Sequence, residues 1–178
     1  MSLHDRLFRR RVRVDECGDI KEKTVSISRT SKTVKGGRRF GFSALIVAGD
    51  GRGHVGYGLG KSNEVPDAIR KGTDQARKGM IRVPLKGTTV PHDVIGKFGP
   101  TEVMIKPGSP GTGVIAGSAV RTVLEAVGVR DVRTKVNGST NPYNVLYATF
   151  NALLALKEPE AVALGRGSTL EELGYAPF

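Results

Sequence analysis

The 178-residue chain has one cysteine, no tryptophan and few other aromatic residues, and each shortage argues against a class of protein. Cys17 alone cannot form an internal disulfide or a metal site with several cysteine ligands, and a single cysteine suits a reducing compartment. The histidines His4, His54 and His92 lack the paired spacing of metal ligands. No apolar run approaches the ~20 residues that span a bilayer. We therefore expect neither a disulfide framework, nor a metal or other cofactor, nor a membrane anchor, and residues 1–19 do not have the apolar segment of a secretory signal.

Positive charge is abundant, and it is concentrated in the first half. The formal net charge is +11. Residues 1–86 hold 20 Lys and Arg against 9 Asp and Glu, whereas residues 87–178 hold 8 of each. A basic block fits contact with phosphates, because each neutralised phosphate releases counterions. A membrane surface is the competing polyanion, but the basic segments lack the Trp or Leu face of an interfacial helix. The charge distribution favours nucleic acid.

The densest part of this charge is the run from Ser31 to Arg39, which has four cationic side chains and no acid. Apolar residues alternate on both sides of it, so the pattern predicts strand, turn, strand. Gly36 and Gly37 can supply the positive φ of a tight hairpin turn, and they leave no Cβ to hold another backbone at a distance. Such a tip is suited to a polyanion. The alternative is a solvated turn whose charge only keeps the protein soluble.

A third strand and a helix complete the first half. Gly49–Gly53 predicts a turn, and residues 54–60 predict a strand whose glycines share one face and leave it open to close packing. Asn63 is the predicted N-cap of a helix with Pro66 in its first turn and an inward stripe that ends at Met80. Three antiparallel strands and a helix with a cationic outer face resemble the double-stranded RNA-binding fold without its first helix.

Two glycine motifs in this half raise the alternative of a nucleotide-binding enzyme. Gly51–Gly56 matches the dinucleotide fingerprint in spacing, but it lies in a turn before a strand and does not open a helix. Gly60-Lys61-Ser62 resembles the end of a phosphate-cradling loop, but that loop is one residue too short. We expect Lys61 to bind a phosphate of a nucleic-acid backbone, and we predict no enzyme and no small-molecule substrate.

Pro84 and Gly87 mark a predicted domain boundary, after which the chain has the pattern of a small α/β unit. The expected strands cover 92–98, 101–106 and 129–136, and the expected helices cover 114–127 and 142–156. Glycines lead into the first of these helices, so the amides near Gly117, followed by Arg121, form a candidate anion site. The alternative is an ordinary tight loop. Asn141 is the predicted cap of the second helix.

The predicted fold class is α+β with two small domains. Residues 1–21 form a basic flexible arm, 22–86 a domain like the double-stranded RNA-binding domain, 87–157 an α/β domain, and 158–178 a tail. The arm carries Arg6, Arg9, Arg10, Arg11 and Arg13, and the tail carries Leu170 and Leu173 at a spacing that suits one partner contact.

Five stretches together resemble the bacterial-type ribosomal protein S5 family, in order and in spacing, from about Val25 to Leu156. They are RTSKTVKGGR at 29–38, GDG at 49–51, GYGLGK at 56–61 followed by EVP at 64–66, GTGVIAG at 111–117 and GSTNP at 138–142.

The resemblance implies more than the charge and the pattern do. Proteins of this family sit in the small ribosomal subunit, on cytoplasmic or organellar ribosomes, and bind ribosomal RNA near the decoding region and the messenger RNA entry path. Their C-terminal domain has the fold named after the family. They pack against ribosomal proteins S4 and S8, influence decoding accuracy, and have neither catalytic activity nor a cofactor. A free-standing double-stranded RNA-binding protein is the alternative.

The predicted RNA contacts lie in the matched stretches and at the cations beside them. They are Arg29, Ser31, Lys32, Thr33, Lys35, Gly36, Gly37, Arg38, Arg39, Arg52, Lys61, Lys106, Gly111, Thr112, Gly113, Gly117, Arg121, Ser139, Thr140 and Asn141. The resemblance also implies that determinants of spectinomycin sensitivity lie at Lys35, Gly36 and Gly37.

Overall fold

The computed structural model describes residues 10–12 and 17–172. The chain divides into two compact units, Met1–Arg82 and Val83–Phe178. The first is built on an antiparallel sheet and the second on a mixed sheet with helices, which confirms the predicted α+β class. The arm residues Arg6, Arg9 and Arg13, and Leu173 of the tail, lie outside the described residues.

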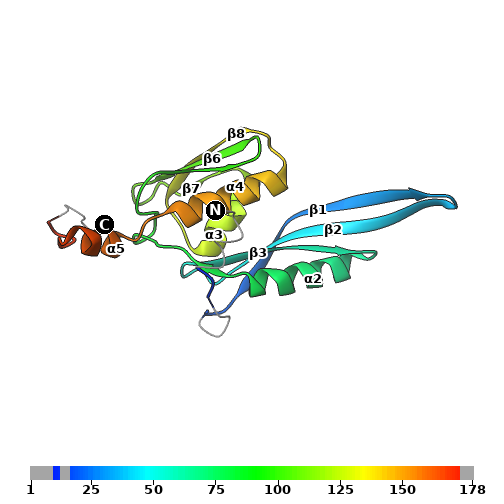
Figure 1. Cartoon of the computed structure of the whole chain (residues 1–178), viewed down its shortest axis with the longest axis horizontal. Helices are drawn as coiled ribbons and strands as arrows, with labels where there is room; N and C mark the ends of the chain where they lie inside the picture. The colour runs from blue at the N-terminus through cyan, green and yellow to red at the C-terminus, as the bar shows by residue number, and fades with distance from the viewer. Residues whose placement is uncertain (1–9, 13–16, 173–178) are drawn as a thin grey trace. The chain divides into compact units, whose positions relative to one another are not determined.

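The first unit is a four-stranded sheet with one helix on it (Figure 1). Its elements are β1 (Lys21–Val34), β2 (Gly37–Gly49), β3 (His54–Ser62), α2 (Val65–Lys78) and β4 (Ile81–Arg82). The strand order is β1-β2-β3-β4, and every neighbouring pair is antiparallel. The short strand β4 adds to the three strands of the predicted sheet, and it lies where the sequence predicts either a short strand or a linker, at 81–86.

Glycines bring α2 unusually close to the sheet. A Cβ at Gly58 would collide with the carbonyl oxygen of Gly72, and a Cβ at Gly60 would collide with that of Ala68. Gly72 and Ala68 belong to the buried stripe of α2. The predicted close-packing face of β3 is therefore confirmed, and its partner is the backbone of the helix.

The hairpin of β1 and β2 runs beyond the rest of this unit (Figure 1). β2 pairs with β3 only from Phe42 to Gly49, whereas its pairing with β1 continues to Val34 and Gly37. Residues 30–41 are thus a two-stranded ribbon with no third strand, which we call the ribbon. At its turn Gly37 has a φ of 124°, but Gly36 is not among the residues with positive φ, so the expectation of two such glycines is only half right.

Two local predictions in this unit are wrong. The N-cap of α2 is Glu64 instead of Asn63, and no side chain caps the helix; Pro66, which needs no amide partner, lies in its first turn. The basic arm is not free at residues 10–12. Arg11 pairs with Ile81 of β4, and the amide of Arg82 donates to the carbonyl oxygen of Arg10.

The second unit has a four-stranded sheet in the order β5-β6-β8-β7. Only the pair β7–β8 is parallel. Helices α3 and α4 lie on one side of this sheet (Figure 1). The elements are β5 (Val94–Phe98), β6 (Thr101–Pro107), β7 (Val114–Ile115), α3 (Ser118–Val127), β8 (Val132–Gly138), α4 (Pro142–Ala155) and α5 (Pro159–Arg166).

Helix α3 begins four residues later than predicted because Val114–Ile115 pairs with β8 as a strand. Its end at Gly128 is confirmed, with Gly128 in the left-handed region. The next strand starts at Val132, later than predicted, because the amide of Val129 still donates to Leu124 and closes the helix. The cap of α4 is confirmed, since the side chain of Asn141 accepts from the amide of Tyr143 at 3.0 Å.

Candidate nucleic-acid interface

The ribbon concentrates exposed cations at a place without acids. Its four cationic residues are all exposed, and Lys32 lies directly opposite Arg39 in the strand register. Among the described residues, no carboxylate is within ion-pair distance of any of the four. Like charges in opposite positions destabilise a strand pair, so this arrangement favours an external anion. The four residues are Lys32, Lys35, Arg38 and Arg39.

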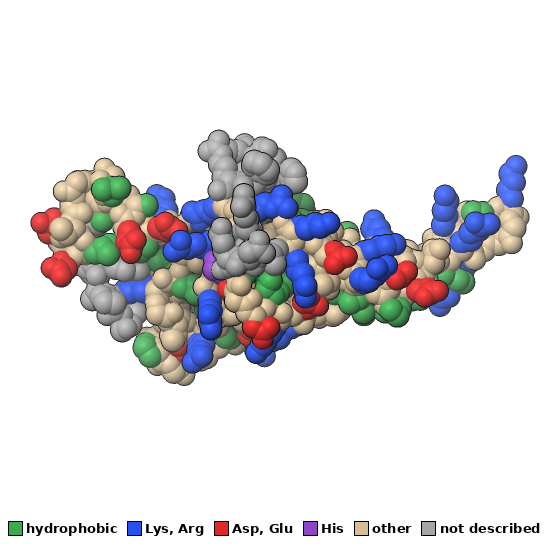
Figure 2. All heavy atoms as spheres, turned by 90° about the horizontal axis from the view of Figure 1, so that it is seen from below, with side chains coloured by type: hydrophobic (Ala, Val, Ile, Leu, Met, Phe, Trp, Pro, Cys, Tyr) green, Lys and Arg blue, Asp and Glu red, His purple; other side chains and the backbone are tan. Residues whose placement is uncertain are grey.

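Figure 2 shows the Lys and Arg side chains that stand out along the projecting hairpin up to its tip. Acidic residues near its base have partners of their own. Arg77 of α2 approaches Glu22 of β1 at 2.6 Å, and Arg70 approaches Asp67 at 3.5 Å. The four cations of the ribbon, at the end of the hairpin away from the core of the unit, have no such partner among the described residues.

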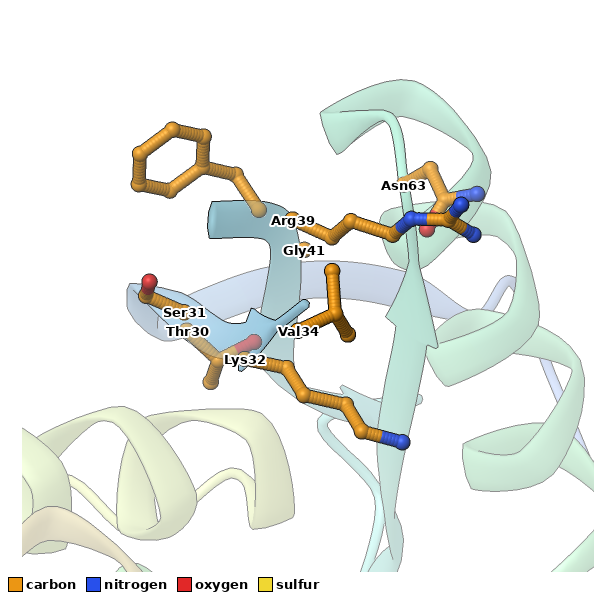
Figure 3. A pocket seen from close by; sticks show the side chains of 8 residues that line it. Thr30, Ser31, Lys32, Val34, Arg39, Gly41 and Asn63 are labelled. Carbon is orange, nitrogen blue, oxygen red and sulfur yellow. The ribbon is translucent and has the colours of Figure 1, made fainter. Parts of the chain in front are cut away.

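A pocket of about 400 Å³ lies against one face of the ribbon. Lys32 and Arg39 enter it from the two opposite strands, and Arg39 extends towards Asn63, just before α2 (Figure 3). The two cationic side chains and the amide around this hollow can all donate hydrogen bonds to phosphate oxygens. The full lining is Thr30, Ser31, Lys32, Val34, Arg39, Phe40, Gly41 and Asn63.

Beside this pocket, Arg29 at the base of the ribbon stacks on Phe40, which is part of the pocket's lining. The guanidinium carbon of Arg29 lies 3.6 Å from the centre of the Phe40 ring, and Phe40 remains 45% exposed. This pair holds the guanidinium in a fixed plane while its N–H groups remain able to donate. Arg29 is among the RNA contacts predicted from the sequence, whereas Phe40 is not, although strand alternation places both on one face.

Arg52 and Lys61, the other predicted contacts of this unit, are exposed but lie away from the ribbon's turn. Arg52 is in the β2–β3 turn, which Asp50 organises by accepting hydrogen bonds from the amides of Arg52 and His54. Burial opposes ionisation of Asp50, but these bonds and the one with the His54 ring lower its pKa. Lys61 belongs to β3, opposite Ser43, so no phosphate-cradling loop forms around it.

In the second unit, the predicted loop at 106–117 is tied to a carboxylate that the sequence analysis missed. Oδ1 of Asp131 accepts from the amides of Gly111 and Gly113, both at 3.0 Å, and Oδ2 accepts from the hydroxyl of Thr88 at 2.7 Å. Gly111 and Gly113 have φ values of 88° and 74°. Because these amides point to Asp131, they do not donate to an external phosphate. The amide and hydroxyl of Thr112 both donate to the carbonyl oxygen of Ser109, so this loop offers the side chains of Ser109 and Lys106 instead.

Asp131 is 6% exposed and remains ionised in this setting. The hydrogen bond from Thr88, followed by that from the amide of Gly113, lowers the pKa of its carboxyl group. The only sequence signal for this role is an acid at the entrance of a strand. Its donors lie 18 to 43 residues away, which no local pattern reveals.

The remaining predicted contacts lie at the N-termini of α3 and α4. Gly117 is the N-cap of α3, and Arg121 one turn on is exposed, with its guanidinium 3.4 Å from the carbonyl oxygen of Val114. Ser139 and Asn141 support the entry to α4: the hydroxyl oxygen of Ser139 accepts from the amide of Asn141 at 3.3 Å. Thr140 between them is exposed.

The predicted contacts therefore form groups in two separate units. Among the described residues, no cluster of three or more His, Cys, Asp or Glu could hold a metal ion, and no helix is long and apolar enough to cross a membrane.

Comparison with known proteins agrees with this arrangement. Residues 20–84 match the family described as ribosomal protein S5, N-terminal domain, and residues 96–166 match ribosomal protein S5, C-terminal domain. A small ribosomal subunit protein uS5 of Chloroflexus aurantiacus is 55% identical over 155 residues, 87% of each chain. Those of Lawsonia intracellularis and Syntrophobacter fumaroxidans are 56% and 54% identical over 84% and 85% of this chain, and 92% of each relative.

Proposed function

The chain belongs to the ribosomal protein S5 family, and from this membership we propose that it is a structural constituent of the small ribosomal subunit that binds ribosomal RNA. Members of the family are structural components and not enzymes. The ribbon is the observation that supports the RNA contact: its four exposed cations extend beyond the core, and no carboxylate of the described residues lies within ion-pair distance of them.

A finer role is proposed on the basis of the same membership. We propose that the protein supports subunit assembly and decoding fidelity near the messenger RNA entry path of a cytoplasmic ribosome. Its neighbours there are small-subunit ribosomal RNA, the messenger RNA, and ribosomal proteins S4 and S8. The ribbon reaches RNA, and the loop held by Asp131 reaches either RNA or S4.

The first test measures binding of the full chain to purified small-subunit RNA over a range of salt concentrations. We expect Lys32→Ala with Arg39→Ala to weaken binding and to lower the salt slope by about 1 for each phosphate that the variant no longer neutralises. The control is Lys157→Ala with Arg166→Ala, which removes the same charge at exposed positions after α4 and in α5. Equal binding by both variants would show that the ribbon is only a solvated turn.

The second test distinguishes the close approach of the ribbon's tip to RNA from the positive charge of that tip. A Cβ at Gly36 would meet no atom within 4 Å, so a bulky residue there fits the free protein. We expect Gly36→Trp to leave folding unchanged, to displace the tip from RNA in assembled subunits and to weaken the effect of spectinomycin. Lys35→Ala should instead reduce assembly affinity and its salt slope. Normal assembly, full drug sensitivity and unchanged chemical protection of the RNA in both variants would contradict the proposal.

The alternative of a free-standing double-stranded RNA-binding protein makes a different prediction. A ribosomal constituent sediments with small subunits at moderate salt, whereas a free module washes off. A sucrose-gradient profile of cells that make the tagged full chain distinguishes the two.

A further inference from the structure

One face of the sheet in the second unit is not covered by the helices. The strand register places the buried residues Val103 and Ile105 on the side of α3 and α4. The alternate positions face the other way and are exposed or half-buried. We call this side the open face. Its side chains are Ile95 and Lys97 of β5, Glu102, Met104 and Lys106 of β6, Arg133, Lys135 and Asn137 of β8, and Ile115 of β7.

Charge in the second half is balanced in number but separated in space. Residues 87–178 hold 8 Lys and Arg and 8 Asp and Glu, which suggested that this half has no positive field. The register, however, places Lys97, Lys106, Arg133 and Lys135 on the open face. Glu102 is the acid on the same face. The remaining acids are elsewhere, in loops, in the helices and in the tail.

In the described part of the chain, the cations in the middle of the open face have no neutralising partner. Lys106 and Arg133 are direct register partners on the neighbouring strands β6 and β8. Among the described residues, no carboxylate is within ion-pair distance of Lys106, Arg133 or Lys135. Glu102, the acid on this face, forms an ion pair with Lys97 of β5 at 2.6 Å. Like charges directly opposite each other destabilise a strand pair, so an external polyanion on this face would remove a repulsion.

The two exposed aliphatic residues of the open face, Ile95 and Ile115, do not lie at its centre, and Met104 on the inner strand β6 is half-buried. Ile95 is 52% exposed and Ile115 53% exposed, and they lie on the two outermost strands. The cations of β6 and β8 stand between them. The centre of a protein–protein interface is usually apolar and depleted in Lys, whereas a cationic centre with isolated aliphatic residues suits a phosphate backbone and its sugars.

We propose that the open face is a second RNA-binding surface of this protein. Arg133, Lys135 and Lys106 contact the phosphates of one segment of RNA, and Ile95 and Met104 lie under its sugars. This inference rests on the proposed function, because it assumes that the protein works in contact with ribosomal RNA. It adds a surface in the second unit that shares Lys106 with the loop held by Asp131 and that involves no residue of the ribbon.

The test is charge reversal with a matched control. Arg133→Glu with Lys135→Glu changes the net charge by the same amount as Lys157→Glu with Arg166→Glu, which lie off the open face. We expect the first variant of the full chain to bind small-subunit RNA more weakly and with a salt slope lower by about 2, one for each phosphate that is no longer neutralised. The control should keep a slope close to that of the wild type. Arg133→Gln with Lys135→Gln serves as a milder variant, with thermal unfolding of each variant as the check on folding.

A positional readout complements the affinities. In a Cys17→Ser background, Asn137→Cys carries a tethered iron chelate on the open face, and Lys157→Cys carries it away from that face. Hydroxyl radicals from the first probe should cut a defined segment of the ribosomal RNA in reconstituted subunits. That segment should lose its cleavage when the Arg133→Glu and Lys135→Glu changes are added.

The outcomes separate this inference from the proposed function. If the wild type does not bind the RNA, the proposed function fails together with the inference. If the ribbon variant weakens binding but the open-face reversal behaves like its control, the inference alone is overturned. If Ile95→Asp releases a neighbouring protein from the subunit while the charge reversal leaves the salt slope unchanged, the partner is a protein and the inference is wrong.

Discussion

The two units seat a helix on a sheet by the same means but expose their cations in different ways. In the first, Gly58 lies under α2; in the second, Gly96 of β5 lies under α4, where a Cβ would collide with the carbonyl oxygen of Ala148. In the first unit, the cations follow two strands beyond the end of the core. In the second, cations and core residues share the same strands and point to opposite faces. The charged surface is thus separated from the core along the strands in the first unit. In the second unit it is separated from the core by the two faces of the same strands.

We expect the largest losses of stability from substitutions at Gly58 and Gly96, the glycines that lie under α2 and α4. Gly58→Val and Gly96→Val each place a branched side chain where helix backbone already lies, and we expect a loss of about 3 kcal/mol or more in the stability of the unit concerned. Amide hydrogen exchange should show lost protection in α2 for the first variant and in α4 for the second. Loss of protection in both units from either change would show that they do not fold separately, contrary to the predicted division of the chain near residues 82–87.

The next effect concerns the loop in the second unit. Asp131→Ala removes the acceptor of two glycine amides, so hydrogen exchange at Gly111 and Gly113 should accelerate about tenfold or more, with little change in α4. Asp131→Asn is the matched control, because its amide oxygen can accept from both glycines and its NH₂ can donate to Thr88. Equal exchange in the Ala variant and the wild type would mean that the carboxylate does not order the loop.

The same carboxylate gives the loop a dependence on pH. Since folding lowers the pKa of Asp131, its stabilising contribution is complete above the ordinary Asp value of about 3.9 and is lost as pH falls through the lowered pKa. Protection of the Gly111 and Gly113 amides should therefore decrease only in acid. The Asp131→Asn variant should lack this step, and the same step in both proteins would assign it to another group.

The smallest effect is expected at the tip of the ribbon. Gly37 has a φ of 124°, so Gly37→Ala strains the turn, but the ribbon can open without unfolding the core, and the loss of global stability should stay below about 1 kcal/mol. Gly36→Ala is the control, because its Cβ meets no neighbour and its φ is not positive. A loss at Gly37 as large as at Gly58, measured by urea denaturation, would show that the ribbon is part of the cooperative core.

The sequence predicted what depends on local pattern. Alternation and glycine spacing indicated β3 and its packing face, and Asn141 with Pro142 indicated the start of α4. The start of α3 was wrong because Val114 and Ile115 are equally suited to a helix or a strand, and their pairing with β8 decides.

The long-range features of the candidate sites were missed for the same reason. The donors to Asp131 come from distant parts of the chain, and the charge on the open face depends on which residues of β5, β6 and β8 become neighbours. The net charge of residues 87–178 therefore does not reveal that cations gather on one face of the sheet.

The length of β1 has a consequence for the protein before it meets RNA. β1 spans Lys21–Val34 at the edge of its sheet, and the ribbon has an open edge on both strands. Long open edges can pair with the edges of other chains and lead to aggregation, and lysines on an edge strand are a common protection against this. Lys21 and Lys32 lie on this edge strand, and their positive charges oppose its pairing with another copy. Free protein should accordingly become more prone to self-association as added salt screens these charges.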